Sequence, residues 1–241
     1  MSTTTPAGTP IEGATALVTG GNRGFGRANV DELLDRGATK VYATSRSPHA
    51  SHDERVVPLV LDVADDDSVA AAAHDASDVS IVVNNAGIAL STPVLAAPLD
   101  DIRSELETNL FGLIRITRAF APILGRHPKS SLVNVLSVLS WLSFGTGYEI
   151  SKAAAWSATN SMRLRLREQG TTVTALHVAY MDTDMTAHID APKSDPRDIA
   201  RQAADAILTG QYEILADETT RAVKSQLSQD LTNLYTQLAA A

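Results

Sequence analysis

The chain has 241 residues, a formal net charge of −8, 44% hydrophobic side chains and no cysteine. This length and hydrophobic content suit a single domain with a sizeable core. The lack of cysteine excludes disulfides, thiol catalysis and cysteine-ligated metal sites, and the scattered basic residues exclude the basic patch of a nucleic-acid-binding protein. Because the sequence has no long apolar run and no basic leader, we expect a cytoplasmic protein that binds neither nucleic acid nor membrane.

Short apolar runs rich in β-branched residues alternate along the chain with longer stretches of helical spacing. The runs predict strands at 14–19, 40–44, 56–61, 79–84, 131–136, 172–178 and 212–216. The helical stretches are 29–36, 68–74, 99–124, 148–167 and 196–208. Such alternation indicates right-handed βαβ crossovers, so we expect an α/β fold with a doubly wound parallel sheet and helices on both faces.

Glycines follow the first predicted strand in the segment TGGNRGFG, where Gly20, Gly24 and Gly26 precede a predicted helix. Glycine lets the backbone turn sharply and approach a phosphate closely, and a helix N-terminus presents free N–H groups to an anion. The segment therefore predicts a site for a phosphate-bearing cofactor. A purely steric strand-to-helix turn is the alternative interpretation.

The spacing T-G-x-x-x-G-x-G differs from the dinucleotide fingerprint G-x-G-x-x-G and resembles the cofactor motif of the short-chain dehydrogenase/reductase family. Four further segments follow in that family's order: Asp62-Val63 after the third strand, NNAG at 84–87, Asn109 in TNLFG, and Tyr148-x-x-x-Lys152. The resemblance spans most of the chain. It implies a single NAD(P)-binding Rossmann domain at 11–241, and the small, polar, proline-bearing start MSTTTPAGTP predicts a flexible tail at 1–10.

Tyr148 and Lys152 stand four residues apart at the start of a predicted helix, so both side chains project from one face. A nearby ammonium and an oxidised nicotinamide favour the phenolate of a tyrosine, whose reference pKa is about 10. In reduction, hydride passes from the nicotinamide while Tyr148 donates a proton to the carbonyl oxygen. By resemblance, Ser137 orients the carbonyl, with Ser140 the weaker candidate, and the backbone of Asn109 holds a water linked to Lys152.

The other cofactor contacts come from the resemblance. Asp62 accepts from the adenine amino group or else caps the next helix, and NNAG lines the adenosine ribose or else forms only a turn. Thr183 matches a threonine that contacts the nicotinamide carboxamide, although Val178 and Ala179 replace the Pro-Gly pair usual before it. The full expected cofactor set is Gly20, Asn22, Arg23, Gly24, Phe25, Gly26, Ser45, Arg46, Asp62, Val63, Asn84, Ala86, Gly87, Tyr148, Lys152 and Thr183.

The residues after the second strand indicate which nicotinamide cofactor is used. An NAD enzyme places an acidic residue there to bind the ribose diol, whereas this chain has Ser45-Arg46 and reaches its first acid at Asp53. Arg23 in the glycine segment is expected to approach the same point. Because guanidinium groups pair well with phosphate oxygens, we expect NADP(H) rather than NAD(H), unless both arginines are simply solvated.

Together these motifs predict an NADPH-dependent carbonyl reductase that converts a ketone or aldehyde into an alcohol. One alternative is a nucleotide-sensing protein of the same fold without turnover, which the intact serine, tyrosine and lysine disfavour. The other is an extended-type sugar-nucleotide epimerase or dehydratase, which usually needs a longer C-terminal region than the one that follows Thr183. By resemblance, the helices at 99–124 and 148–167 pair copies into a homodimer or homotetramer, or else their apolar stripes only cover the sheet.

The substrate is expected to contact residues 91–94, residues 141–147 and the loop after Thr183. Only eleven positions separate Ser137 from Tyr148. This gap is shorter than is usual in the family and predicts a tight loop at the mouth of the site. The following side chains suggest a pocket for an apolar or aromatic small molecule, unless the first three belong to the core: Trp141, Leu142, Phe144, Met181, Met185 and His188.

Overall fold

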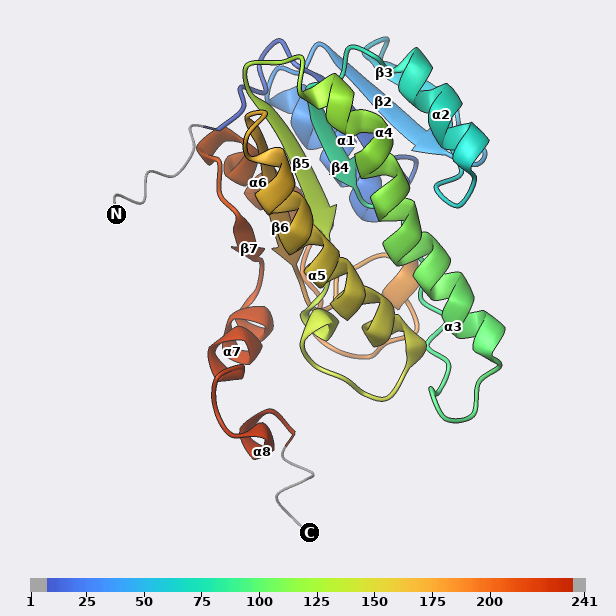
Figure 1. Ribbon diagram of the computed structural model, residues 1–241, viewed down its shortest axis with the longest axis vertical. Helices are drawn as coiled ribbons and strands as arrows, with labels where there is room; N and C mark the ends of the chain where they lie inside the picture. The colour runs from blue at the N-terminus through green and yellow to red at the C-terminus, as the bar shows by residue number, and fades with distance from the viewer. Residues whose placement is uncertain (1–7, 236–241) are drawn as a thin grey trace.

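The structure is a computed structural model that describes residues 8–235. Its strands form one parallel sheet in the order β3-β2-β1-β4-β5-β6-β7 (Figure 1). The predicted doubly wound fold is confirmed, and each predicted strand is found to within two residues. The strands are β1 (Thr15–Thr19), β2 (Lys40–Ser45), β3 (Val56–Val60), β4 (Ile81–Asn84), β5 (Ser130–Val135), β6 (Thr171–His177) and β7 (Glu213–Leu215).

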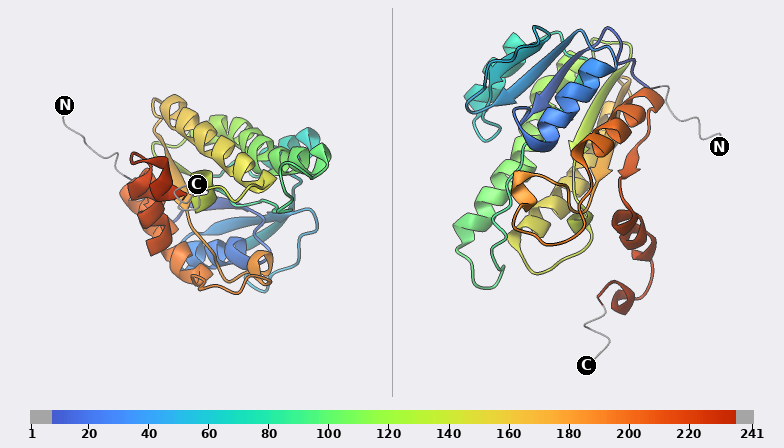
Figure 2. Two further views of the ribbon diagram at one scale, coloured as in Figure 1. Left: turned by 90° about the horizontal axis from the view of Figure 1, so that it is seen from below. Right: turned by 180° about the vertical axis from the view of Figure 1, so that it is seen from behind.

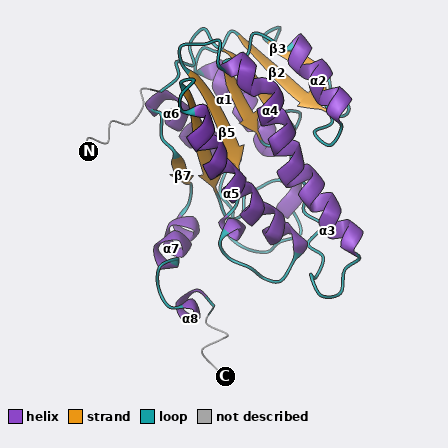
Figure 3. Ribbon diagram, in the orientation of Figure 1, coloured by secondary structure: helices purple, strands orange, loops and turns teal. Residues whose placement is uncertain are grey.

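Helices connect the strands, except that a loop joins β2 to β3 (Figure 3). Several carry clear start and stop signals: Asp65 caps α2, and α6 begins with the cap Asp195 and Pro196 and ends at the left-handed Gly210. Among residues 8–235, no helix is long and apolar enough to cross a membrane. The helices are α1 (Gly24–Asp35), α2 (Asp66–Asp75), α3 (Leu99–Leu106), the π-helix η1 (Glu107–Gly112), α4 (Leu113–Leu124), the 3₁₀ turn η2 (Val138–Ser140), α5 (Gly147–Leu166), the 3₁₀ turn η3 (Asp184–Thr186), α6 (Pro196–Thr209), α7 (Glu218–Gln226) and α8 (Leu231–Leu234).

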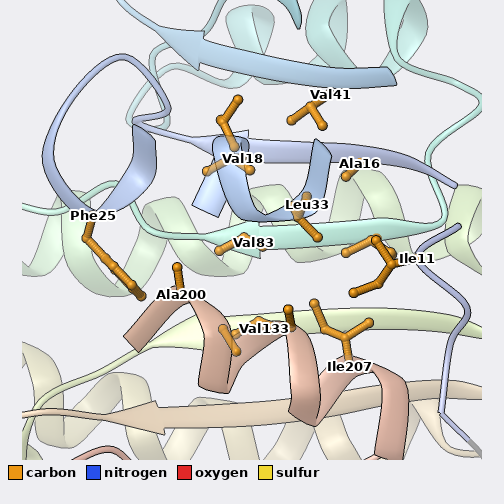
Figure 4. Close-up of a cluster of buried hydrophobic side chains, with 14 of the residues drawn as sticks. Ile11, Ala16, Val18, Phe25, Leu33, Val41, Val83, Val133, Ala200 and Ile207 are labelled. Atoms are coloured by element: carbon orange, nitrogen blue, oxygen red, sulfur yellow. The ribbon is translucent and has the colours of Figure 1, made fainter. Parts of the chain in front are cut away.

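The helices cover the sheet in two layers, which the left view of Figure 2 shows end on. On one face, α1 and α6 bury their apolar sides against the strands, and Leu33 and Ile207 pack near Val83 and Val133 (Figure 4). On the other face, α2, α4 and α5 cover a second cluster that includes Phe120. Burial of apolar surface on both faces explains why the central strands read as continuous hydrophobic runs.

The N-terminal segment departs from the expected tail. Thr9 is buried, its N–H donates to the Ile207 carbonyl at 2.8 Å, and its hydroxyl accepts from Ser131 at 2.8 Å. The expectation of a flexible tail over 1–10 is therefore wrong for residues 8–10, which are fastened to α6 and β5. The remainder of that expectation, residues 1–7, lies outside the described residues.

Candidate active site

The motifs found in the sequence meet at the carboxyl edge of the sheet, where a doubly wound fold binds its ligands. Ser137 lies two residues after β5, Tyr148 and Lys152 lie in the first two turns of α5, and Asn109 lies in η1. The Ser137 hydroxyl lies close enough to the Tyr148 hydroxyl to lower its pKa, and Lys152 Nζ lies 5.6 Å from the centre of the Tyr148 ring. The structure thus brings together the serine, tyrosine and lysine that the sequence singled out.

The environment of Tyr148 keeps its hydroxyl protonated. Burial raises the pKa of Tyr148 to about 12, the Ser137 hydroxyl opposes this rise, and the nearby Glu105 carboxylate adds to it. The sequence led us to expect that the Lys152 ammonium lowers the pKa of Tyr148. Desolvation of the tyrosine has the larger effect, and it raises this pKa. A protonated tyrosine near the serine hydroxyl is arranged to act as a proton donor.

Lys152 is buried and donates from Nζ to the Val135 carbonyl at 2.9 Å. Burial lowers the pKa of Lys152 to about 8, so the ammonium remains the main form at neutral pH. The amine has a lower proton affinity than an exposed lysine. It is therefore suited to give up and regain a proton near physiological pH.

Asn109 uses its whole side chain to hold the loop after β4. Its carbonyl oxygen accepts from the Ile88 N–H at 2.9 Å, and its amide donates to the Ile88 carbonyl and to Ser151 Oγ, both at 2.9 Å. Only its backbone is left to face the site, and the wider π-helical turn loosens the backbone ladder there. Asn109 and Lys152 line a small cavity of about 10 Å³. A cavity of this size holds roughly one water molecule.

The two candidate serines differ in their surroundings. Ser137 Oγ accepts from the Leu139 N–H at 3.1 Å, while the Ser137 carbonyl lies 3.1 Å from His177 Nδ1. Ser140 Oγ is buried and has no hydrogen-bond partner within residues 8–235. Of the two hydroxyls, only that of Ser137 acts on the pKa of Tyr148.

The glycine segment forms a cradle at the start of α1. Gly20 and Gly24 have positive φ angles of 68° and 53°, and a Cβ on Gly26 would lie 2.0 Å from the Gly20 carbonyl oxygen. Side chains are therefore excluded from this turn. In the described part of the chain no side chain caps the N-terminus of α1, and its first turn holds no acidic residue. The free N–H groups and the lack of negative charge fit a phosphate-bearing cofactor.

Thr19 and Asn85, which sequence reasoning left out, fasten this cradle to the NNAG loop. The Thr19 hydroxyl accepts from the N–H groups of Asn85 and Ala86, both at 2.9 Å, and Asn85 Nδ2 donates to the Thr19 carbonyl at 2.9 Å. The signal was available, since Asn85 lies inside the motif. By contrast, the Asn84 side chain turns into the core and donates to Asn134 Oδ1 at 2.9 Å, so it can face a cofactor only through its backbone.

The residues expected around the adenosine occupy the ends of β1 to β3. Asn22 donates to Ser45 Oγ at 2.7 Å, which joins the glycine segment to the end of β2. One oxygen of Asp62 accepts from the Ala64 N–H at 2.9 Å, whereas the cap of α2 is Asp65. Asp62 therefore does not cap α2. Val63 and Phe25, two further residues of the expected cofactor set, are buried.

The two expected phosphate arginines have different partners. Arg23 pairs with Asp184 at 2.9 Å, and both side chains are exposed, at 80% and 76%. The expected approach of Arg23 to the end of β2 stays a prediction. Arg46 is exposed beside Ser45 and forms no ion pair with any described residue. It remains the cation next to the expected ribose site.

The loop after β6 passes over the glycine cradle. A Cβ on Gly24 would lie 3.5 Å from the Thr183 side chain, which places Thr183 against the first turn of α1. The unusual Val178-Ala179 pair is held firmly: Val178 is buried, and the Ala179 N–H donates to Asp217 Oδ2 at 2.7 Å. Asp217 also caps α7, so the C-terminal region supports this loop.

The residues expected to form an apolar wall divide into two groups. Trp141 stacks on the His177 ring with centroids 3.8 Å apart and meets Trp156 edge to face, so it belongs to interior packing behind Ser137. Phe144 is 63% exposed in the loop before α5, and Leu90 and Met185 are also exposed in neighbouring loops. Apolar side chains are therefore exposed in the loops around the site, whereas Trp141 is part of the packing behind it.

The fold and this site define an oxidoreductase of the doubly wound class. The model of the short chain dehydrogenase family matches residues 14–194, and the chain belongs to that family.

The chain is similar to known proteins over most of its length. It is 30% identical over 214 residues to the 3-oxoacyl-(acyl-carrier-protein) reductase of Vibrio harveyi, covering 79% of this chain and 88% of that protein. It is 29% identical to the 1-deoxy-11-beta-hydroxypentalenate dehydrogenase of Streptomyces avermitilis, covering 94% and 85%. A short chain dehydrogenase from Burkholderia cenocepacia, solved in complex with NADP, superposes with a TM-score of 0.87 at 34% identity, covering 95% and 99%.

Proposed function

We propose that this protein is a cytoplasmic NADP(H)-dependent carbonyl reductase that converts a ketone or aldehyde into an alcohol. The observation that carries the proposal is the placement of the Ser137 hydroxyl near the Tyr148 hydroxyl, with Lys152 beside the tyrosine ring and the pKa of Tyr148 raised to about 12. A proton donor and a second hydroxyl at one point are what a carbonyl oxygen needs as it gains negative charge.

The residues of the chain divide this work among them. Ser137 donates a hydrogen bond to the substrate carbonyl, and Tyr148 donates the proton that turns the oxygen into a hydroxyl. Lys152 and a water in the cavity beside Asn109 return a proton to Tyr148. The glycine cradle and the loops after β2, β4 and β6 hold the cofactor, whose nicotinamide supplies the hydride when bound.

The preference for NADP(H) rests on the end of β2. No acidic side chain stands there among the described residues; the chain continues with Ser45 and Arg46, and Asp53 pairs with Arg55 at 2.7 Å. A hydroxyl and a guanidinium suit the additional phosphate of NADP, whereas a carboxylate would repel it. The NADP complex of the Burkholderia protein, at 34% identity, supports the same choice.

The experiment is an assay of NADPH oxidation with a panel of apolar and aromatic ketones and aldehydes, run on the protein and on Tyr148→Phe. We expect turnover by the protein and loss of turnover by the variant, with NADPH binding measured by fluorescence nearly unchanged, because the ring still packs but the proton donor is gone. Cofactor binding without consumption of NADPH on any carbonyl would instead indicate a sensor. Ordinary activity in Tyr148→Phe would refute the mechanism.

A further inference from the structure

Two buried carboxylates lie beside the active site without touching the reacting atoms, and Glu105 acts on Tyr148 only through its charge. Glu149 follows Tyr148 in α5 and is 4% exposed, and Glu105 lies in α3 and is 0% exposed. Neither carboxylate forms an ion pair with a described residue. A buried charge without a counter-ion is costly unless hydrogen-bond donors stabilise it. The hydrogen bonds that each carboxylate accepts therefore indicate what it does in the structure.

Glu149 is the centre of the loop that leads into the catalytic helix. Its Oε2 accepts from Ser143 Oγ at 2.7 Å and from the N–H groups of Gly145 and Thr146 at 3.0 Å and 2.7 Å, and its Oε1 accepts from the Phe144 N–H at 2.9 Å. The contact with Thr146 also completes a capping box at the start of α5. One side chain therefore fixes both the short loop and the first turn of α5, which holds Tyr148.

Glu105 holds the loop on the other side of the mouth. Its Oε1 accepts from the Leu90 N–H at 2.7 Å, next to Ser91, whose φ of 55° is rare for a residue other than glycine. Its Oε2 has no hydrogen-bond partner among the described residues and lies against the start of α5, since a Cβ on Gly147 would come into close contact with it. Glu105 thus holds the strained loop and fits closely against the residue before Tyr148.

The two loops are joined to each other. The Val94 N–H donates to the Gly145 carbonyl at 2.9 Å, the Gly147 N–H donates to the Thr92 carbonyl at 3.3 Å, and Pro93 forms an isolated antiparallel bridge with Thr146. Loops 90–94 and 143–147 therefore form one unit, which we call the paired mouth loops. The exposed Leu90 and Phe144 side chains project from this unit.

We propose that Glu105 and Glu149 are positioning residues that hold the paired mouth loops in one shape, so that the enzyme selects carbonyl substrates by fit to a rigid apolar mouth. The selection of substrates in this inference rests on the proposed function, whereas the holding of the loops does not. A carboxylate suits the role of Glu149 because it accepts from four donors and offers none, whereas the NH₂ group of a glutamine would face an N–H group on one side. Neither residue touches the reacting atoms.

Amide hydrogen exchange on the cofactor-free protein tests the hold directly. In Glu149→Gln, and more strongly in Glu149→Ala, the amides of residues 144–146 are expected to exchange about tenfold faster or more, because hydrogen bonds to a charged acceptor are lost. In Glu105→Gln the exchange rate of the Leu90 amide is expected to increase. Amides of β4 and β5 should keep their rates, as should all amides in the matched control Glu54→Gln, whose side chain is exposed in the turn before β3.

Steady-state kinetics with one compact and one bulky carbonyl compound test the consequence. We expect KM to change more than kcat in the two mouth variants, and the ratio of kcat/KM between the two substrates to fall several-fold towards equality. Faster exchange with an unchanged ratio would overturn the role in selection. A lower melting temperature with unchanged amide exchange at residues 144–146 would show that Glu149 does not hold the loop. If the protein reduces no carbonyl compound, the proposed function fails while the exchange result still decides the role of Glu149.

Discussion

At the scale of single residues, two serines three positions apart have opposite environments, and this difference can be measured. The Ser137 hydroxyl acts on the pKa of Tyr148, whereas the Ser140 hydroxyl is buried without a partner in the described part of the chain. Ser137→Ala is expected to lower kcat by about a hundredfold to a thousandfold, since one donor to the developing oxyanion is lost. Ser140→Ala is the matched control and should leave kcat within a few-fold. Equal losses in both variants would show that Ser137 has no special role.

The cofactor preference depends on a second pair of similar residues, Arg46 and Arg23. Arg46→Ala is expected to weaken NADPH about tenfold or more while leaving NADH unchanged, because a charged hydrogen bond to phosphate is lost. Arg23→Ala should change the NADPH Michaelis constant much less, since an exposed ion pair such as Arg23–Asp184 contributes little. Titration of both cofactors into each variant checks this. An unchanged NADPH constant in Arg46→Ala would refute the assignment.

Sequence reasoning found the residues that belong to a motif and missed those that act through hydrogen bonds across the chain. Tyr148 and Lys152 are recognisable because their chemistry requires a fixed spacing on one helix face. Glu105 and Glu149 read as ordinary helix-surface acids, and only the folded loops bring N–H donors to both oxygens of Glu149 and to one oxygen of Glu105. The pairing of Arg23 with Asp184, 161 positions apart, depends on a loop path that residue types alone do not define.

At the scale of elements, the apolar runs predict the strands well because these strands are buried on both faces. The helical stretch at 99–124 is continuous in space, but its middle is the π-helix η1, since a period of 3.6 residues does not reveal one extra residue in a turn. The short α7 and α8 were not predicted. The segment of α7, ETTRAVKSQ, is mostly polar, and its position depends on Asp217 and on packing against its neighbours.

The packing of β6 against η2 makes stability depend on pH. His177 is fully buried under Trp141, and burial lowers the pKa of His177 from 6.5 to about 4. Because the unfolded chain binds this proton at higher pH than the folded chain does, stability is lost as pH falls from 6.5 towards 4, by up to roughly 3 kcal/mol.

Urea unfolding at pH 7 and at pH 4.5 checks this, with His177→Asn as the comparison. The variant is expected to be less stable at pH 7, because it loses the aromatic stacking. It should also lose less stability on acidification than the unmodified protein, because the carboxylates that titrate in this range are common to both. An equal loss in both proteins would show that His177 does not contribute to the acid sensitivity.

At the scale of the whole molecule, α5 presents to the solvent a stripe that is uncharged as far as Leu164. Its exposed positions recur mostly every three or four residues, which places them on one side of the helix, and they are Ile150, Ala153, Ser157, Ser161, Leu164 and, in the last turn, the charged Arg165. Leu164 is 75% exposed, and α4 lies beside α5 on the same face of the sheet (Figure 1). Small side chains allow two helices to approach closely, and the apolar ends of the stripe offer area to bury.

We therefore expect a homodimer or homotetramer in which α5 packs against α5 of a second copy. Light scattering at micromolar concentration should give a mass of two or four chains. Leu164→Glu should shift the mass towards the monomer, because a charge at a packed interface loses its hydration without gaining a partner. Leu208→Glu, on the exposed side of α6, carries the same change on the opposite face of the sheet and should leave the mass unchanged. A monomeric unmodified protein, or equal effects of the two substitutions, would show that the stripe on α5 is not an interface between copies.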